Sequence, residues 1–218
     1  MFNILFRFII NPYIPIQRKP RIKEIIRLLV IFVLLSVPLG LICNFICKEF
    51  RISYVGISNE STRIILYAVF IAPILEEILF RSWLKWSKQT IYILIATFIS
   101  VVVVSFIDHR FQYHWIMLFL LLLVGILIYL LNNIKVEPFI AKHFNYFYWS
   151  SSIAFGLVHA SNFTGNIRYL IGFSFILGSP QILGGFILGY VRMNNGLRYS
   201  ILFHFLINSI LLLKLLNR

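Results

Sequence analysis

Long blocks of apolar residues, each about the length of a membrane-spanning helix, constrain this chain more than any other feature. Of its 218 residues, 60% are hydrophobic and 12% are charged, whereas an average soluble domain carries roughly 25% charge. The apolar residues form continuous runs rather than the single stripe of a helix that faces water on its other side. A soluble core could not hide so many of them, so we expect a helical protein that lies in lipid.

About seven segments approach the roughly 20 mostly apolar residues that a transmembrane helix needs. They are residues 24–47, 63–83, 91–107, 115–131, 148–160, 169–191 and 199–216. The sequence therefore predicts an all-α fold, a polytopic transmembrane helical bundle of about seven spans. Gly178, Ser179 and Pro180 predict a break in the sixth span, and Gly185 with Gly189 predicts a close helix crossing.

A basic N-terminal segment, residues 1–23, precedes a single transmembrane domain, residues 24–218, that holds the candidate site. The formal net charge is +13, and the basic residues lie mostly in the first 27 residues and between apolar blocks. Topology and attraction to anionic lipid head groups explain this pattern better than nucleic-acid binding. The segment could lie on the membrane surface, and its basic cluster predicts a cytoplasmic N-terminus.

Charged side chains interrupt the second apolar block. A charged residue at the centre of a membrane helix costs about 2.5–3.5 kcal/mol, so this helix needs partners on other helices. Glu77 and Arg81 are four residues apart with the acid first, which favours an ion pair. Glu76 points about 100° away from Glu77 and can face something else. Pro73 cannot donate to the Val69 carbonyl, which predicts a bend one turn before the glutamates.

Two further polar sets lie in later apolar blocks. One is His159, preceded by Phe155, and the other is the pair His204 and Asn208, which share one helix face. Each set alone could be a structural histidine or a hydrogen bond between helices. Together with Glu76 they supply a base, a water-orienting group and oxyanion donors from three helices, which are the parts needed for acyl hydrolysis.

The ordered set of motifs resembles the CPBP family, also called the Abi or CAAX-protease and bacteriocin-processing family. The motifs are Glu76-Glu77-x-x-x-Arg81, Phe155-x-x-x-His159 and His204-x-x-x-Asn208. Each motif is weak alone, but their order within hydrophobic helices is specific. The resemblance extends from Pro73 to Asn208 and implies a membrane-embedded protease with its active site inside the helical bundle.

The resemblance also implies roles for individual residues. Glu76 would be the general base that activates water, and His159 would help to hold that water. The oxyanion of the tetrahedral intermediate would be stabilised by His204 and Asn208. Three other residues would support the site or bind substrate, namely Glu77, Arg81 and Phe155.

A metal is an open question at this stage. Glu76, His159 and His204 could bind zinc, which would make the chain a zinc-dependent version of the same protease. The sequence has no His-Glu-x-x-His motif, and Asn208 is a poor zinc ligand but a good oxyanion donor. We therefore favour a glutamate-type mechanism without a cofactor.

The expected substrate is a membrane-associated peptide or protein, and the expected location is a bacterial cytoplasmic membrane. The Ile-, Asn- and Lys-rich composition is typical of bacteria, which argues against a prenylated substrate. A non-catalytic immunity or scaffold protein of the same family is an alternative, but a scaffold has no need of the complete motif set. A transporter or proton relay would be favoured by an inverted repeat, and the sequence shows none.

Overall fold

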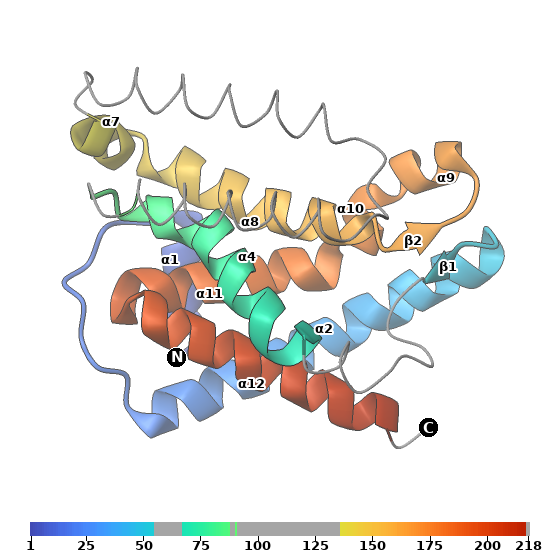
Figure 1. Cartoon of the computed structure of the whole chain (residues 1–218), viewed down its shortest axis with the longest axis horizontal. Coiled ribbons are helices and arrows are strands. Elements are labelled where there is room, and N and C mark those ends of the chain that lie inside the picture. The colour runs from blue at the N-terminus through green and yellow to red at the C-terminus, as the bar shows by residue number, and fades with distance from the viewer. Residues whose placement is uncertain (55–66, 88–89, 91–135, 217–218) are drawn as a thin grey trace.

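The computed structural model describes residues 1–54, 67–87, 90 and 136–216, and about 80% of these residues are helical (Figure 1). The longer helices are α1 (Phe2–Ile10), α2 (Ile22–Glu49), α4 (Ala72–Arg81), α8 (Phe144–Ala160), α11 (Ser179–Asn195) and α12 (Leu197–Leu216). The shorter ones are the π-helix η1 (Tyr67–Ile71), the 3₁₀-helix η2 (Ser82–Leu84), α7 (Val136–Lys142), α9 (Ile167–Gly172) and α10 (Ser174–Leu177). Two short strands, β1 (Ser53–Tyr54) and β2 (Phe163–Thr164), pair antiparallel. The predicted all-α class is confirmed.

The predicted number of membrane spans is not confirmed. Within the described residues, α2 is the one helix that is long and apolar enough to cross a membrane by length and composition. The predicted spans at residues 91–107 and 115–131, and the start of the span at residues 63–83, lie outside the described residues. The total of seven spans therefore stays a prediction.

The break predicted in the sixth span is confirmed, because α10 ends before Gly178 and α11 begins directly after it. The close crossing is confirmed as well, since α11 packs directly against α8 (Figure 1). A Cβ atom on Gly185 would lie 2.8 Å from the Ser152 carbonyl oxygen, and one on Gly156 would lie 2.6 Å from the Ile182 backbone nitrogen. Only glycine allows the two backbones to approach this closely.

The N-terminal helix α1 is attached to the bundle. Leu5 and Phe8 are buried in the main hydrophobic core, and the Phe8 ring packs edge-on against Tyr148 of α8. The indole nitrogen of Trp149 donates a hydrogen bond to the Ile9 carbonyl at 2.7 Å. The segment of residues 1–23 therefore begins with a docked helix, and its location at the membrane surface stays a prediction.

Candidate active site

The helix α4 buries its charged residues and exposes apolar ones. Glu77 and Arg81 are 0% and 1% exposed, whereas Ile74 and Leu79 are 36% and 39% exposed. Pro73, Glu77 and Arg81 are four residues apart and form one buried face. Charged residues are almost never fully buried in soluble proteins unless they are paired. Apolar residues on the outside and charged residues on the inside suit a helix that faces lipid.

Glu77 is the centre of a buried polar network between α4 and α12. Its Oε1 atom lies 3.2 Å from Nη1 of Arg81, so the predicted ion pair is present. The same oxygen lies 3.0 Å from Nδ1 of His204, and Oε2 accepts a hydrogen bond from the Ser200 hydroxyl. An ionised carboxylate can only accept, so Nδ1 of His204 carries the proton that joins the two groups.

Glu76 faces both histidines, as the proposed site requires. Its Oε2 atom lies 3.7 Å from Nε2 of His159 and 3.6 Å from Nε2 of His204. These distances exceed a direct hydrogen bond and are within reach of one bridging water. The side chains of Glu76 and His159 are 25% and 21% exposed, whereas that of His204 is 5% exposed. The structure thus brings together the acid and the two histidines from α4, α8 and α12.

The tautomers of the two histidines follow from their other nitrogen atoms. Nδ1 of His159 lies 2.8 Å from the Phe155 carbonyl oxygen, which can only accept, so this nitrogen carries the hydrogen. In His204 the hydrogen is on Nδ1 as well, because Glu77 accepts it. When both rings are neutral, each Nε2 presents a lone pair toward Glu76. The buried Glu76 Oε2 has no hydrogen-bond partner among the described residues, so three acceptors converge on one point.

Phe155 contacts the arginine of the ion pair and both histidines. Its ring centroid is 3.9 Å from Cζ of Arg81, a cation–π contact, and 4.5 Å and 5.7 Å from the rings of His159 and His204. The side chain is 3% exposed. Phe155 therefore fixes the relative positions of three polar side chains by packing.

Asn208 is tied to the segment before α4. Its Nδ2 atom donates a hydrogen bond to the Ala68 carbonyl at 3.0 Å. Ala68 belongs to the π-helix η1, in which a carbonyl accepts from the residue five positions later. That residue is Pro73, which has no N–H. The sequence predicts an unpartnered carbonyl at Val69, and in the structure Asn208 binds the carbonyl one residue earlier, that of Ala68.

Comparison with protein families adds to this geometry. Residues 58–210 match the family of type II CAAX prenyl endopeptidases described as Rce1-like. The chain belongs to this family. The match confirms the resemblance to CAAX proteases and covers all seven residues singled out in the sequence. Members of the Rce1-like family are membrane-embedded proteases. No curated protein and no solved structure matched the chain.

Two residues that the sequence did not single out position the site of this Rce1-like protein. Ser200 lies one helical turn before His204 and donates to Glu77. Arg192 is buried near the end of α11, where Nε donates to the Arg81 carbonyl at 3.0 Å and Nη2 donates to the Ser82 carbonyl at 3.2 Å. A cation at the C-terminal end of a helix satisfies its free carbonyls. Arg192 thus holds the end of α4 against α11.

A zinc site would need these three side chains to converge on one ion. Glu76, His159 and His204 have the chemistry of a zinc site, because each histidine leaves Nε2 unprotonated and fixes its ring through Nδ1. As placed in the described part of the chain, however, no three His, Cys, Asp or Glu side chains form a group that could hold a metal ion. We therefore derive no step through a metal.

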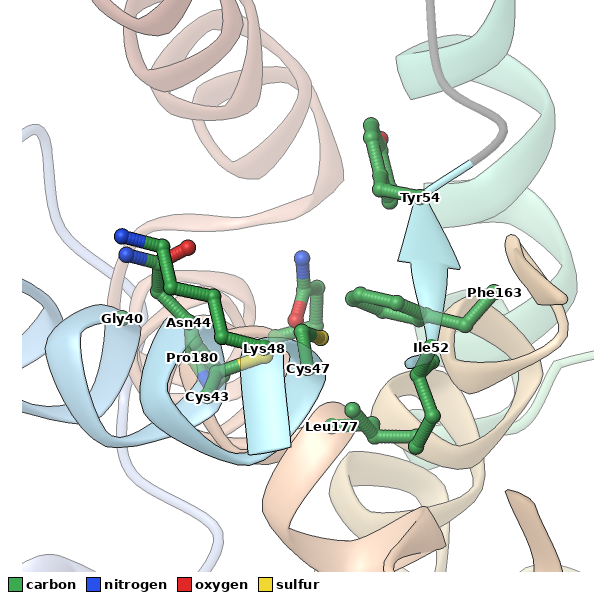
Figure 2. Close-up of a pocket in the computed structure, with 11 residues that line it drawn as sticks. Gly40, Cys43, Asn44, Cys47, Lys48, Ile52, Tyr54, Phe163, Leu177 and Pro180 are labelled. Carbon is green, nitrogen blue, oxygen red and sulfur yellow. The ribbon is translucent and has the colours of Figure 1, made fainter. Parts of the chain in front are cut away.

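A separate pocket of about 340 Å³ lies beside α2 (Figure 2). Cys43, Cys47 and Lys48 line it on one side, and Phe163 and Leu177 line it on the other. Both cysteines are free thiols. None of the seven motif residues lines this pocket, so it is distinct from the site around Glu76.

Proposed function

We propose that this chain is an intramembrane endopeptidase that hydrolyses a peptide bond of a membrane-associated peptide or protein with water activated by Glu76. The observation that carries the proposal is the convergence of Glu76 Oε2 with Nε2 of His159 and of His204. Three acceptors that face one point need a hydrogen donor between them, and a water molecule supplies two hydrogens. Family membership supports proteolysis independently of this geometry.

The first step is attack on the substrate carbonyl. Glu76 takes a proton from the water, whose orientation is fixed by Nε2 of His159, and the water oxygen bonds to the carbonyl carbon. The carbonyl oxygen becomes an oxyanion. One amide hydrogen of Asn208 is held by Ala68, which leaves the other free to donate to this oxyanion.

His204 can donate only after Nε2 acquires a proton. Glu76 can pass on the proton it took from water when the two atoms, which lie 3.6 Å apart, approach to hydrogen-bond distance. Glu77 at Nδ1 then balances the charge of the imidazolium, as a carboxylate does for the histidine of a catalytic triad. The proton finally moves to the leaving amine as the C–N bond breaks, which yields a carboxylic acid and a free amine.

The test compares wild type with Glu76→Gln in proteoliposomes that contain lipid-anchored reporter peptides, including prenylated ones. Because general-base catalysis contributes typically about 10²–10⁴-fold, cleavage should fall by at least about 100-fold. Glu137→Gln, on the exposed surface of α7, is the matched control and should cleave like wild type. Equal cleavage by Glu76→Gln and wild type would refute the role given to Glu76.

A zinc-dependent version is the second candidate, since the same convergence of acceptors would suit a cation. Chelation of the purified protein separates the two candidates. Unchanged cleavage after chelation supports the glutamate-type mechanism, whereas loss of cleavage that zinc restores supports the metalloprotease. A non-catalytic scaffold of the same family would bind a reporter peptide but leave it intact.

A further inference from the structure

We propose that a pocket between α2, α11 and α12 binds one anionic phospholipid of the surrounding bilayer, with an acyl chain inside and the phosphate at its basic rim. The pocket has a volume of about 390 Å³, which is in the size range of small-molecule sites. Leu202 and Leu206 line it and lie about 200° around α12 from His204. The pocket is therefore on the far side of α12 from the candidate active site, and the proposal is independent of proteolysis.

Polar residues line the rim of the pocket and apolar residues line its depth. Four of the lining residues are polar, namely Arg18, Glu24, Asn194 and Asn195. The loop between α1 and α2, drawn in blue on the left of Figure 1, is fixed to the end of α11 at this rim. The Arg18 N–H donates to the Asn194 carbonyl, and the Asn195 amide donates to the Arg18 carbonyl, both at 2.9 Å. These two hydrogen bonds hold the loop that forms the rim in a defined position against α11.

The depth of the pocket suits a hydrocarbon chain. Leu28 of α2 and Phe203 of α12 line it and are buried, whereas Leu202 and Leu206 of α12 line its exposed side. The lining runs along α12 from Tyr199 to Leu206, which corresponds to about 10 Å at 1.5 Å per residue. A single acyl chain can lie along such an apolar channel.

The rim lies at the level of the lipid phosphates. The helix α2 has the length and composition of a membrane span and begins at Ile22. Three lining residues, Arg18, Pro20 and Glu24, therefore lie near the point where this helix enters the bilayer. The apolar part of the pocket extends from there toward the hydrocarbon.

The charge at the rim selects an anionic head group. Arg18 is occupied by Glu24, with nitrogen–oxygen distances of 2.8 Å and 3.1 Å. Four more cations are exposed and adjacent in sequence to lining residues: Lys19, Arg21, Lys23 and Arg198. In the described part of the chain none of these four has an ion-pair partner. Clusters of Lys and Arg beside a membrane helix attract anionic lipids.

The experiment uses the full chain purified in detergent and titrated with dioleoyl phosphatidylglycerol or dioleoyl phosphatidylcholine. We expect phosphatidylglycerol to raise Tm by about 5 °C near saturation and phosphatidylcholine to raise it much less. Native mass spectrometry should show one retained phosphatidylglycerol. Soluble glycerol phosphate should give no shift, because it has no chain for the pocket. Equal shifts with the two lipids, or a full shift with glycerol phosphate, would overturn the proposal.

Variants locate the bound lipid. Leu206→Trp fills the pocket and should abolish the retained lipid, whereas Leu34→Trp, on the exposed surface of α2 outside the pocket, should keep it. Leu202→Trp is the second filling variant if Leu206→Trp does not fold. Retention of phosphatidylglycerol by the folded filling variant contradicts the proposed location.

Charge variants test the rim separately. Lys19→Gln combined with Lys23→Gln should remove most of the preference for phosphatidylglycerol, and Lys142→Gln in α7 should not change it. An unchanged preference in the double variant would contradict the role of the rim. Glu76→Gln should bind lipid like wild type, so the outcome does not depend on proteolysis.

Discussion

Nδ1 of His204 and Oε1 of Glu77 lie 3.0 Å apart, although 127 residues separate them in the sequence. Arg81 and Ser200 contact the same carboxylate, so the side chain of Glu77 is fully engaged inside the bundle. The neighbouring Glu76 points about 100° away along the helix and faces the open side of the histidines. Two adjacent acids on one helix therefore lie in different surroundings: Glu77 is buried and paired, whereas Glu76 is 25% exposed and is the group that we propose as the base.

The ion pair of Glu77 and Arg81 can be tested by removing one charge or both. Glu77→Leu leaves a buried guanidinium without its counter-charge, so we expect the free energy of unfolding to fall by about 3–5 kcal/mol. Glu77→Leu combined with Arg81→Met should regain most of that stability. Thermal unfolding in detergent measures both effects. Cleavage should stay low in the double variant, because His204 has lost its acceptor, and wild-type cleavage there would contradict this positioning role.

Ser200→Ala tests the hydroxyl that contacts Glu77. Loss of a hydrogen bond to a buried charged acceptor should cost about 1–3 kcal/mol and slow cleavage. Ser150→Ala is the matched control, because its hydroxyl donates to the Phe147 carbonyl on the exposed surface of α8. The control should unfold within about 0.5 kcal/mol of wild type, as is usual for surface substitutions. Equal stability of the two variants in chemical denaturation would argue against a role for Ser200.

Asn208→Ala should affect stability and cleavage for different reasons. The lost hydrogen bond to Ala68 should cost about 1 kcal/mol, and loss of an oxyanion donor should slow cleavage by about 10²–10³-fold. In a Pro73→Ala background the new N–H can serve the Ala68 carbonyl, so the cost in stability should shrink while the loss of cleavage persists. A double-mutant cycle on Tm and on cleavage rate checks this, and additive costs in stability would contradict the proposed pairing.

Gly185→Ala should separate α11 from α8. The new Cβ atom would meet backbone rather than a flexible side chain, and such overpacking typically costs about 1–3 kcal/mol. Gly40→Ala in α2 is the control, since a Cβ atom there meets nothing within 4 Å. Alanine at that helical position should stabilise by up to about 1 kcal/mol. Thermal unfolding of the two variants should therefore shift in opposite directions.

The convergence of Glu76, His159 and His204 was predictable because charged and polar groups in an apolar helix need partners, and only other helices can supply them. The break at Gly178 and the close approach at Gly185 were predictable from local chemistry. The number of spans was harder to predict, because apolar length alone does not distinguish a crossing helix from a buried one.

The contacts made by other residues could not be predicted from the sequence. A serine in a helix can satisfy its hydroxyl on its own backbone, so nothing indicated that Ser200 contacts Glu77. Arg192 lies where a span was expected to end, and a basic residue there has an ordinary explanation in the aqueous interface. The carbonyl of Ala68, in the π-helix before Pro73, is bound by Asn208, which is 140 residues away from Ala68.

Side chains made much later in synthesis bind the segment before α4 and the last residue of α4. Asn208 binds the carbonyl of Ala68, and Arg192 binds that of Arg81, 111 residues before it. At about 5–20 residues per second, a ribosome reaches Asn208 roughly 7–28 s after Ala68. A nascent chain therefore carries both glutamates before it has a working site. The segment that carries both glutamates is therefore made well before the two side chains that bind its ends.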